Sequence, residues 1–362
     1  MLTIIDKYIL KRYLATFAVM LLLFIPIGIV VDVSEKINKM LENKIPFLEI
    51  ALYYYNFTIY FANSLFPIFL FLSVIWFTSK LANDTEIIAI LSSGISFTRF
   101  LRPYIIGASI VSVFVLLMGF FVVPKASEGF NNFRYTYLKG GGKEAMLGDN
   151  TDVYRQISDD EFIYVNSFNA ESKTAFNFSL EKFKNQKLVH KITASRIKYD
   201  PKKRKYTLYD YTKRTVGETN DVIVKLPEKE VVFNFDLEDL APVVYIAETL
   251  SLGKLNAFIK KEKARGSSTI NVYLVVLYKK YSVPVSAFIL TIIAVAVSAM
   301  KRRGGMGTNL AIGIALAFAF VFFDKIFGVL AEKSSIPPML AVWLPNIAFG
   351  ILALYLLRNA KR

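Results

Sequence analysis

The stretch that decides the fold is Tyr104–Val123, which reads YIIGASIVSVFVLLMGFFVV and gives way to PKASEG at residues 124–129. About 20 apolar residues are the length that a helix needs to cross the roughly 30 Å hydrocarbon core of a membrane. The polar block that follows this stretch extends from Lys125 to Thr269. A membrane-crossing segment followed by a block of this length indicates a membrane protein that carries an extramembrane domain.

Five further apolar stretches of membrane-spanning length flank this polar block on both sides. Together with the first they are Tyr13–Val33, Leu52–Ser79, Tyr104–Val123, Val272–Ala299, Asn309–Leu330 and Met339–Leu357. The sequence therefore predicts an α-helical membrane protein with six transmembrane helices and an inserted domain. The expected divisions are residues 1–124 with helices one to three, 125–269 with the inserted domain, and 270–362 with helices four to six.

Composition narrows the functional class. The chain is 54% hydrophobic with 31 Phe and 20 Tyr, and it has no Cys. The absence of Cys excludes a disulfide framework, a thiolate nucleophile and a Cys-type metal site. The net charge of +15 is explained in part by orientation, because basic residues in short loops favour the cytoplasmic side of a membrane.

Four groups of basic residues fall on one side of a six-span path. They are Lys7, Lys11 and Arg12; Lys80, Arg99 and Arg102; Lys301, Arg302 and Arg303; and Arg358, Lys361 and Arg362. The connection from Asp32 to Ile50 lies on the opposite side and mixes acidic with basic residues. Both termini are therefore expected in the cytoplasm, and the inserted domain on the opposite, outer side of the membrane.

The inserted block has a β pattern. Residues Val153–Phe235 alternate apolar and polar positions in short runs separated by turn-forming clusters about every 10 residues. This spacing favours an antiparallel sandwich or jelly roll over βαβ units. The fold class is thus an α-helical membrane protein with an inserted all-β, jelly-roll-like domain.

Searches for catalytic motifs return nothing. The sequence has no G-x-x-x-x-G-K-[ST], H-E-x-x-H or G-x-S-x-G. His190, the only histidine, lies in a strand pattern without acidic or Cys partners and is expected to be structural. A membrane enzyme acting on lipid is therefore the weakest of three hypotheses, and any ATP hydrolysis is expected in a separate subunit.

A helix is predicted on the cytoplasmic side between spans two and three, at residues 83–94. Asn83 at N-cap with Glu86 at N3 forms a capping box, and Gly94 is suited to end the helix. Its apolar side chains are more numerous than a solvated helix needs. The candidate contact residues for a separate ATPase are Asp84, Glu86, Ile87, Ile90, Leu91 and Gly94. The alternative is a plain amphipathic connector at the headgroup layer.

A cationic rim is predicted near the outer face. Asp324 and Lys325 interrupt span five, and ionisable groups inside a span often face a cavity, although their nearness to the span end also permits snorkelling. Arg134, Lys36 and Lys39 lie just beyond other spans and extend the rim. Such a rim suits the phosphates of a lipid head group.

These residues resemble a known family, the lipopolysaccharide-export permeases LptF and LptG, over nearly the whole chain. Glu86–Gly94, EIIAILSSG, is similar to the family's coupling helix. Phe323–Gly328 is followed by Ile336–Pro338 and by Leu344-Pro345, and this region looks closer to LptG than to LptF.

The resemblance implies half of an ABC transporter in the bacterial inner membrane that extracts lipopolysaccharide from that membrane in Gram-negative outer-membrane biogenesis. It also implies that the inserted domain lies in the periplasm. The implied partners are an LptB-type ATPase dimer that uses ATP and Mg²⁺, an LptF-type permease, and LptC/LptA-type periplasmic β proteins that receive the lipid. No cofactor is expected on this chain. Glu86 matches the coupling acid and Arg134 a lipopolysaccharide-binding basic residue, whereas Val31 and Asn131 stand where the family has basic residues. The alternative is a membrane-anchored scaffold whose β domain binds envelope proteins without transport.

Overall fold

The structure is a computed structural model that describes most of the chain. The described residues are 3–138, 150–169, 172–200, 205–217, 219–233, 235, 245–267, 269–299, 305–333 and 336–360. The basic turn at 301–303 and the basic pair at 361–362 lie outside them. The chain divides into two compact units, one of residues 1–37, 51–127 and 274–362 and the other of residues 38–50 and 128–273.

Six helices in the described part of the chain are long and apolar enough to cross a membrane, which confirms the predicted class. The helices that carry them, in chain order, are α1 (Ile4–Glu42), α2 (Phe47–Asn83), α4 (Phe97–Leu117) with its continuations η1 (Met118–Val122), α5 (Val123–Phe133) and η2 (Arg134–Leu138), α9 (Ile270–Ser298), α10 (Gly305–Lys333) and α11 (Pro338–Ala360). Three short helices complete the set: α3 (Glu86–Ser92), α7 (Ile246–Thr249) and α8 (Leu252–Ala264).

The first helices are much longer than their apolar stretches. Helix α1 has 39 residues, a length of about 58 Å at 1.5 Å per residue. The connection predicted from Asp32 to Ile50 is therefore mostly helical, and only residues 43–46 separate α1 from α2. Hydropathy finds the part of a helix that suits lipid, but backbone hydrogen bonding continues into polar sequence, so the loop prediction was wrong.

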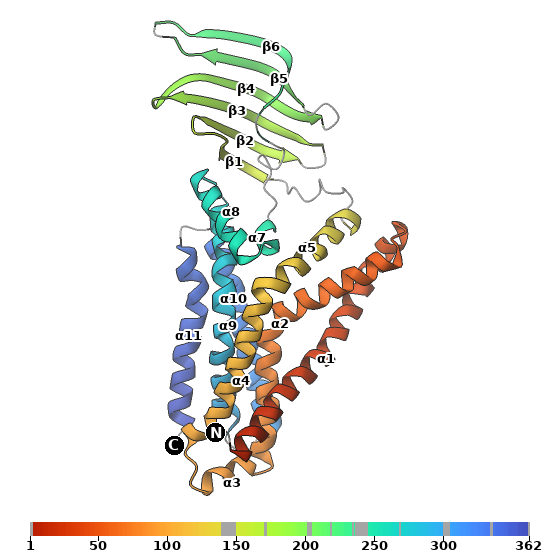
Figure 1. The fold of residues 1–362 in the computed structure, drawn as a ribbon, viewed down its shortest axis with the longest axis vertical. Coiled ribbons are helices and arrows are strands. Elements are labelled where there is room, and N and C mark those ends of the chain that lie inside the picture. The colour runs from red at the N-terminus through yellow and green to blue at the C-terminus, as the bar shows by residue number, and fades with distance from the viewer. Residues whose placement is uncertain are drawn as a thin grey trace. The chain divides into compact units, whose positions relative to one another are not determined.

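The helical unit is built around α9 (Figure 1). In its most apolar segment, 67% of the residues of α9 are buried, against 11% for α1 and 17% for α10. Tyr13 of α1 is fully buried, and its hydroxyl lies 2.9 Å from the hydroxyl of Thr291 on α9. Gly107 of α4 makes this contact possible, since a Cβ there would lie 2.7 Å from the Tyr13 ring. Helices α1 and α10 thus leave broad apolar surface uncovered.

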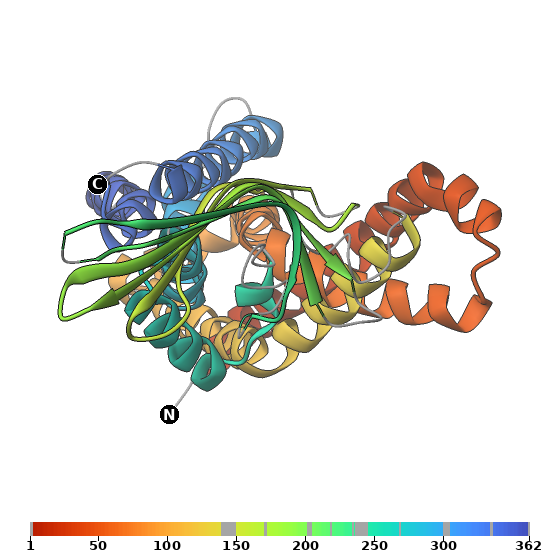
Figure 2. The same cartoon turned by 90° about the horizontal axis from the view of Figure 1, so that it is seen from above.

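The described strands form one antiparallel sheet in sequence order (Figure 2). They are β1 (Asn150–Gln156), β2 (Glu161–Asn169), β3 (Thr174–Lys184), β4 (Lys187–Asp200), β5 (Lys205–Thr215) and β6 (Val222–Val231). Antiparallel pairing was predicted and is confirmed. The expected sandwich or jelly roll has two packed layers, whereas the described strands make a single hydrogen-bonded meander.

The strands change their inward-facing alternation at one common level, here called the fold line, and this explains how one sheet encloses a core. Along a regular strand, inward-facing residues are two apart. Here the buried positions shift by three midway along the middle strands, from Val165 to Phe168, Ala175 to Phe178, Ala194 to Ile197 and Leu208 to Tyr211. The ladder of every strand pair omits residues at this same level.

Polar residues occupy the fold line. Asn177 and Asp210 have positive φ angles of 51° and 54°, a backbone region that Asn and Asp tolerate better than other non-glycine residues. The Ser195 hydroxyl donates to Oδ2 of Asp210 at 2.6 Å. Buried residues from both halves of the sheet join in one apolar cluster, so the inner face is shared on either side of the fold line.

The two edges of the sheet differ. At the first edge, the Gln156 N–H donates to the carbonyl of Arg265 at 3.1 Å, and the buried Arg155 pairs with Glu262 of α8 at 2.8 Å. At the other edge, β6 pairs with β5 alone among the described strands and is exposed along almost all its length. His190 sits inside the sheet, where burial and nearby Lys213 and Lys182 lower its pKa, so it remains neutral as a structural residue.

Candidate functional site

Helix α3 connects α2 with α4 and is shorter than predicted. It begins at Glu86, its N-cap is Thr85 with φ 62°, and no side chain caps it. The predicted capping box is therefore wrong: Asn83 is the last residue of α2, because that helix continues three residues beyond Lys80. The predicted stop is confirmed, since Gly94 has φ 89°, a conformation that glycine adopts readily.

The apolar side chains of α3 are divided between the chain's own core and the surface. Ile87 is 1% exposed, and Ile90 and Leu91 pack against the main apolar cluster of the helical unit. Ile87 therefore anchors the helix and offers no surface to a partner. Ile88, one of the apolar side chains of this helix that was not among the predicted contact residues, is 50% exposed. With Asp84 and Glu86 it forms the outward side of the connection.

Two polar contacts tie this connection to the first turn of α1. The Tyr8 hydroxyl donates to the Glu86 carboxylate, with oxygen–oxygen distances of 3.1 and 3.4 Å. Arg99, near the beginning of α4, donates through Nη2 to Oδ2 of Asp6 at 2.8 Å. Sequence reasoning placed Glu86 correctly on the connection but gave no sign that the N-terminal turn reaches it.

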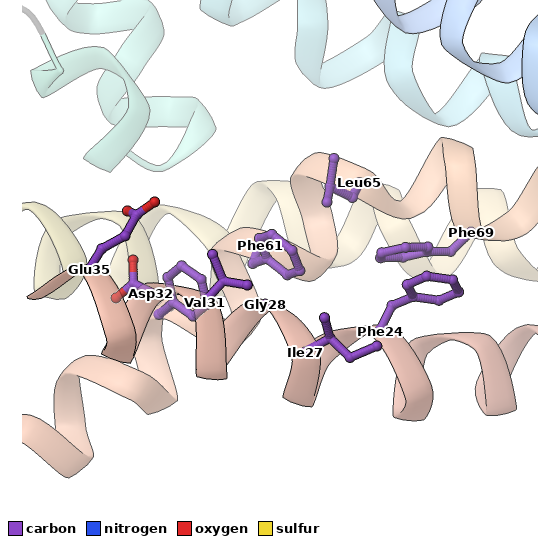
Figure 3. A pocket seen from close by; sticks show the side chains of 10 residues that line it. Phe24, Ile27, Gly28, Val31, Asp32, Glu35, Phe61, Leu65 and Phe69 are labelled. Carbon is purple, nitrogen blue, oxygen red and sulfur yellow. The ribbon is translucent and has the colours of Figure 1, made fainter.

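An apolar groove of about 410 Å³ lies between α1 and α2 (Figure 3). Phe24 stacks on Phe69 with ring centroids 5.1 Å apart, and Gly28 leaves room for Phe61, whose ring lies 2.5 Å from where a Cβ would be. Two carboxylates, Asp32 and Glu35, lie at one end of the row of aromatic and aliphatic side chains. The lining is formed by Phe24, Ile27, Gly28, Val31, Asp32, Glu35, Phe57, Phe61, Leu65 and Phe69.

The predicted rim residue Lys36 is engaged within the chain. It forms an ion pair with Asp32, one turn earlier on α1, and donates to the Tyr53 hydroxyl at 2.9 Å. That hydroxyl in turn donates to Asp32 at 2.9 Å. Since the Lys36 charge is compensated by a carboxylate, Lys36 is a poor candidate for a free phosphate-binding cation.

The other rim residues belong to different parts of the molecule. Lys325, on α10, and Lys39, near the end of α1, are exposed. Arg134 is half-buried, and its guanidinium lies 5.5 Å from the centre of the Phe130 ring. Lys36 and Lys325 belong to the helical unit, whereas Lys39 and Arg134 belong to the unit that contains the sheet. Their role in binding phosphate stays a prediction.

Sequence reasoning missed two lysines inside span four. Lys279 of α9 donates to Asp324 of α10 at 3.0 Å, and Lys280 donates to the carbonyl of Gly119 at 2.9 Å, within the π-helical segment η1. Asp324 is thus partnered with Lys279 and does not serve the rim. The same argument that singled out Asp324, an ionisable group within an apolar span, would have found both lysines.

The fold and these sites define a class: a multi-pass membrane protein with six spanning helices, an inserted antiparallel β domain and an apolar groove between its first two helices. A family model described as "Lipopolysaccharide export system permease LptF/LptG" matches residues 7–359. The chain belongs to this family, and it is a transporter permease, not an enzyme. The match does not separate LptF from LptG. A comparison with curated proteins finds no match.

Proposed function

We propose that this chain is one permease half of an ATP-driven exporter that extracts lipopolysaccharide from the bacterial inner membrane and passes it to a periplasmic bridge. ATP and Mg²⁺ are used by a separate LptB-type ATPase dimer. A second, LptF-type permease completes the membrane part, and LptC/LptA-type β proteins continue the bridge. Family membership and the intramembrane groove support this function.

The groove between α1 and α2 is the observation that carries the proposal. Its lining is apolar except for Asp32 and Glu35 at one end. An acyl chain gains about 0.8 kcal/mol for each buried CH₂. Several chains held in the membrane therefore do not escape by thermal motion, and extraction needs an energy source.

The energy source must dock on this chain, since the sequence has no phosphate-binding loop of its own. The connection from Asp84 to Gly94 offers Asp84, Glu86 and the exposed Ile88 as the docking surface. The beginning of α1, the end of α11 and α3 lie at the same end of the helical unit (Figure 1). Lys80, Arg99, Arg102 and Arg358 mark that end as cytoplasmic.

The outward side of the exporter recognises phosphate through basic residues that form no ion pair with a carboxylate in the described part of the chain. Lys39, Arg134 and Lys325 fill this role, with Arg134 suited to bidentate binding. Lys36 instead holds Asp32 and Tyr53 in place at the end of the groove.

The periplasmic handover uses the exposed edge of β6. An unpaired strand edge is a template for pairing with another β protein, and Val222, Ile223 and Val224 on β6 are each at least 45% exposed. The same observation favours the alternative, in which the chain is a scaffold that binds envelope β proteins without transport. The two functions differ in whether an ATPase is bound and coupled.

Reversing the charge of Glu86 tests the proposed function. We expect Glu86→Lys to remove the ATPase from the purified complex, because a basic side chain in place of a docking carboxylate repels a cationic partner site. Copurification of the ATPase and ATP-dependent release of lipopolysaccharide from vesicles are the measurements. Glu42→Lys, an equal charge reversal on the exposed end of α1, is the control. A parent complex that purifies without an ATPase would support the scaffold, whereas an ATPase that is bound and used normally after Glu86→Lys would contradict docking through Glu86.

Filling the groove tests its role in lipid binding. We expect Gly28→Leu to reduce photo-crosslinking of lipopolysaccharide at Ile27 about tenfold, as overpacking by a few methylenes would, because a Cβ at position 28 would lie 2.5 Å from the Phe61 ring and the new side chain would displace that ring within the groove. ATPase binding should be unchanged. Gly307→Leu on α10, where a Cβ meets no atom within 4 Å, is the control. Equal labelling in the two variants would place the lipid elsewhere.

A further inference from the structure

Residues at the beginning of α1 form hydrogen bonds with both ends of the α3 connection. Tyr8 donates to Glu86, the first residue of α3, and Asp6 accepts from Arg99, three residues after Ser96, the N-cap of α4. The Asp6 carboxylate is further fixed by the backbone N–H of Thr3 at 2.9 Å. Two neighbouring α1 residues thus hold groups that flank α3 in the sequence.

Helix α3 has little intrinsic stability. It has seven residues, the side chain of its N-cap Thr85 does not cap it, and glycine ends it. Helices of this length are not stable by themselves. Its position therefore depends on the packing of Ile87 and on the two contacts with α1, so the displacement of α3 and that of α1 are linked.

Helix α1 joins this connection to the groove. The same helix carries Tyr8 at one end and Phe24, Ile27 and Gly28 along the groove. Tyr8 and Gly28 are 20 residues apart, about 30 Å along a helix. Between them, Tyr13 holds α1 against α4 and α9, and Pro26 removes one backbone hydrogen bond just before Gly28.

We propose that Asp6 and Tyr8 are positioning residues of the ATPase-coupling site, and that they pass the movement of α3 through α1 to the groove. This inference rests on the proposed function and adds the route by which the ATPase acts on the lipid. Tyr8 orients the Glu86 carboxylate, and the Asp6–Arg99 ion pair keeps the beginning of α4 moving with α1. Neither residue needs to touch the lipid.

The test compares binding of the ATPase with movement at the groove. The chain has no Cys, so spin labels can be attached at Val30→Cys on α1 and Tyr55→Cys on α2, both exposed and outside the groove lining. Distances between the labels are measured in the complete complex in lipid nanodiscs, with and without ATP and vanadate. Tyr8→Phe removes only a hydroxyl, and Asp6→Asn removes the ion pair.

We expect both variants to keep their ATPase and the KM for ATP, while the fraction of complexes that change distance with nucleotide falls about threefold, as loss of one hydrogen bond of ordinary net strength would cause. A purely structural role would lower the amount of complex but leave this fraction unchanged. Tyr355→Phe, which alters an exposed tyrosine of α11, is the matched control and should behave as the parent.

The outcomes separate the inference from the proposed function. If Glu86→Lys abolishes the distance change while Tyr8→Phe and Asp6→Asn match the parent, the positioning role is overturned and ATPase coupling stands. If the parent complex carries no ATPase and shows no distance change with nucleotide, the proposed function fails and the inference with it. Should Asp6→Asn reduce the amount of folded chain, Tyr8→Phe alone decides.

Discussion

Replacing Glu262 by Ala is expected to lower the free energy of unfolding of the β domain by about 3–5 kcal/mol, the usual effect of removing one partner of a buried ion pair. The Arg155 and Glu262 side chains are 5% and 2% exposed, and their charged atoms are 2.8 Å apart. Ala in place of Glu262 keeps the Arg155 charge inside the protein and removes the carboxylate that compensates it.

The position of this pair enlarges the effect. Glu262 lies on α8 and Arg155 on β1, and the adjacent Gln156 N–H bonds to the Arg265 carbonyl. The pair therefore fixes α8 against the first strand, and its loss exposes a sheet edge as well as a charge.

Hydrogen exchange of β1 and β2 in the full chain in detergent is the measurement. Glu161→Ala is the control, since it breaks the more exposed Lys182 pair, which is worth about 1 kcal/mol or less. Replacing both partners, Arg155→Met with Glu262→Leu, should recover most of the loss. Equal protection in Glu262→Ala and Glu161→Ala would show that the buried pair does not stabilise the domain.

How much of the fold was predictable follows from the kind of signal each element carries. The membrane spans could be predicted because hydropathy depends on composition over about 20 residues. The ends of α1 and α2 could not, because residues such as Lys36 and Glu42 are compatible with either a helix or a loop.

The fold line in the sheet was hidden for a different reason. Turn spacing gives the strand lengths and the antiparallel order, but not the extra residue that each middle strand inserts at the same level. The only signal was the recurrence of Asn166, Asn177, Ser195 and Asp210 in mid-strand, where β propensity disfavours Asn and Asp. Its meaning appears only when the strands are in register.

The candidate site was predictable in its parts and not in its contacts. Glu86 and Gly94 follow from local sequence, whereas the partners of Glu86 and Arg99 lie 78 and 93 residues away. The rim prediction treated each lysine as free, because sequence does not show which carboxylate lies beside it. Lys36 is paired with Asp32, and Asp324 is paired with Lys279.

Removing the carboxylate of Asp324 is the second change expected to have a large effect. Asp324→Ala leaves Lys279 without its counter-charge inside a membrane-spanning helix. A lysine costs about 2.5–3.5 kcal/mol at the centre of a span on insertion scales, which is an upper bound for Lys279 because it lies in the first third of α9. Gly328 shows how closely Lys279 is fitted to α10, since a Cβ there would lie 3.1 Å from its Nζ. We expect a lower melting temperature in lipid nanodiscs and a smaller folded yield.

Restoring charge balance distinguishes a true ion pair from two separate contributions. If the Lys279–Asp324 pair joins α9 to α10, Lys279→Ala combined with Asp324→Ala should be more stable than Asp324→Ala alone, because no uncompensated charge remains in the span. Lys325→Ala is the matched control, for it removes an exposed lysine next to Asp324 in the sequence and should change the melting temperature little. Additive effects of the Lys279 and Asp324 changes, or an effect of Lys325→Ala as large as that of Asp324→Ala, would contradict the pairing. Recovery in the double variant would mean that Lys279 of span four and Asp324 of span five serve to neutralise each other's charge. The candidates for the cationic rim would then be Lys39, Arg134 and Lys325.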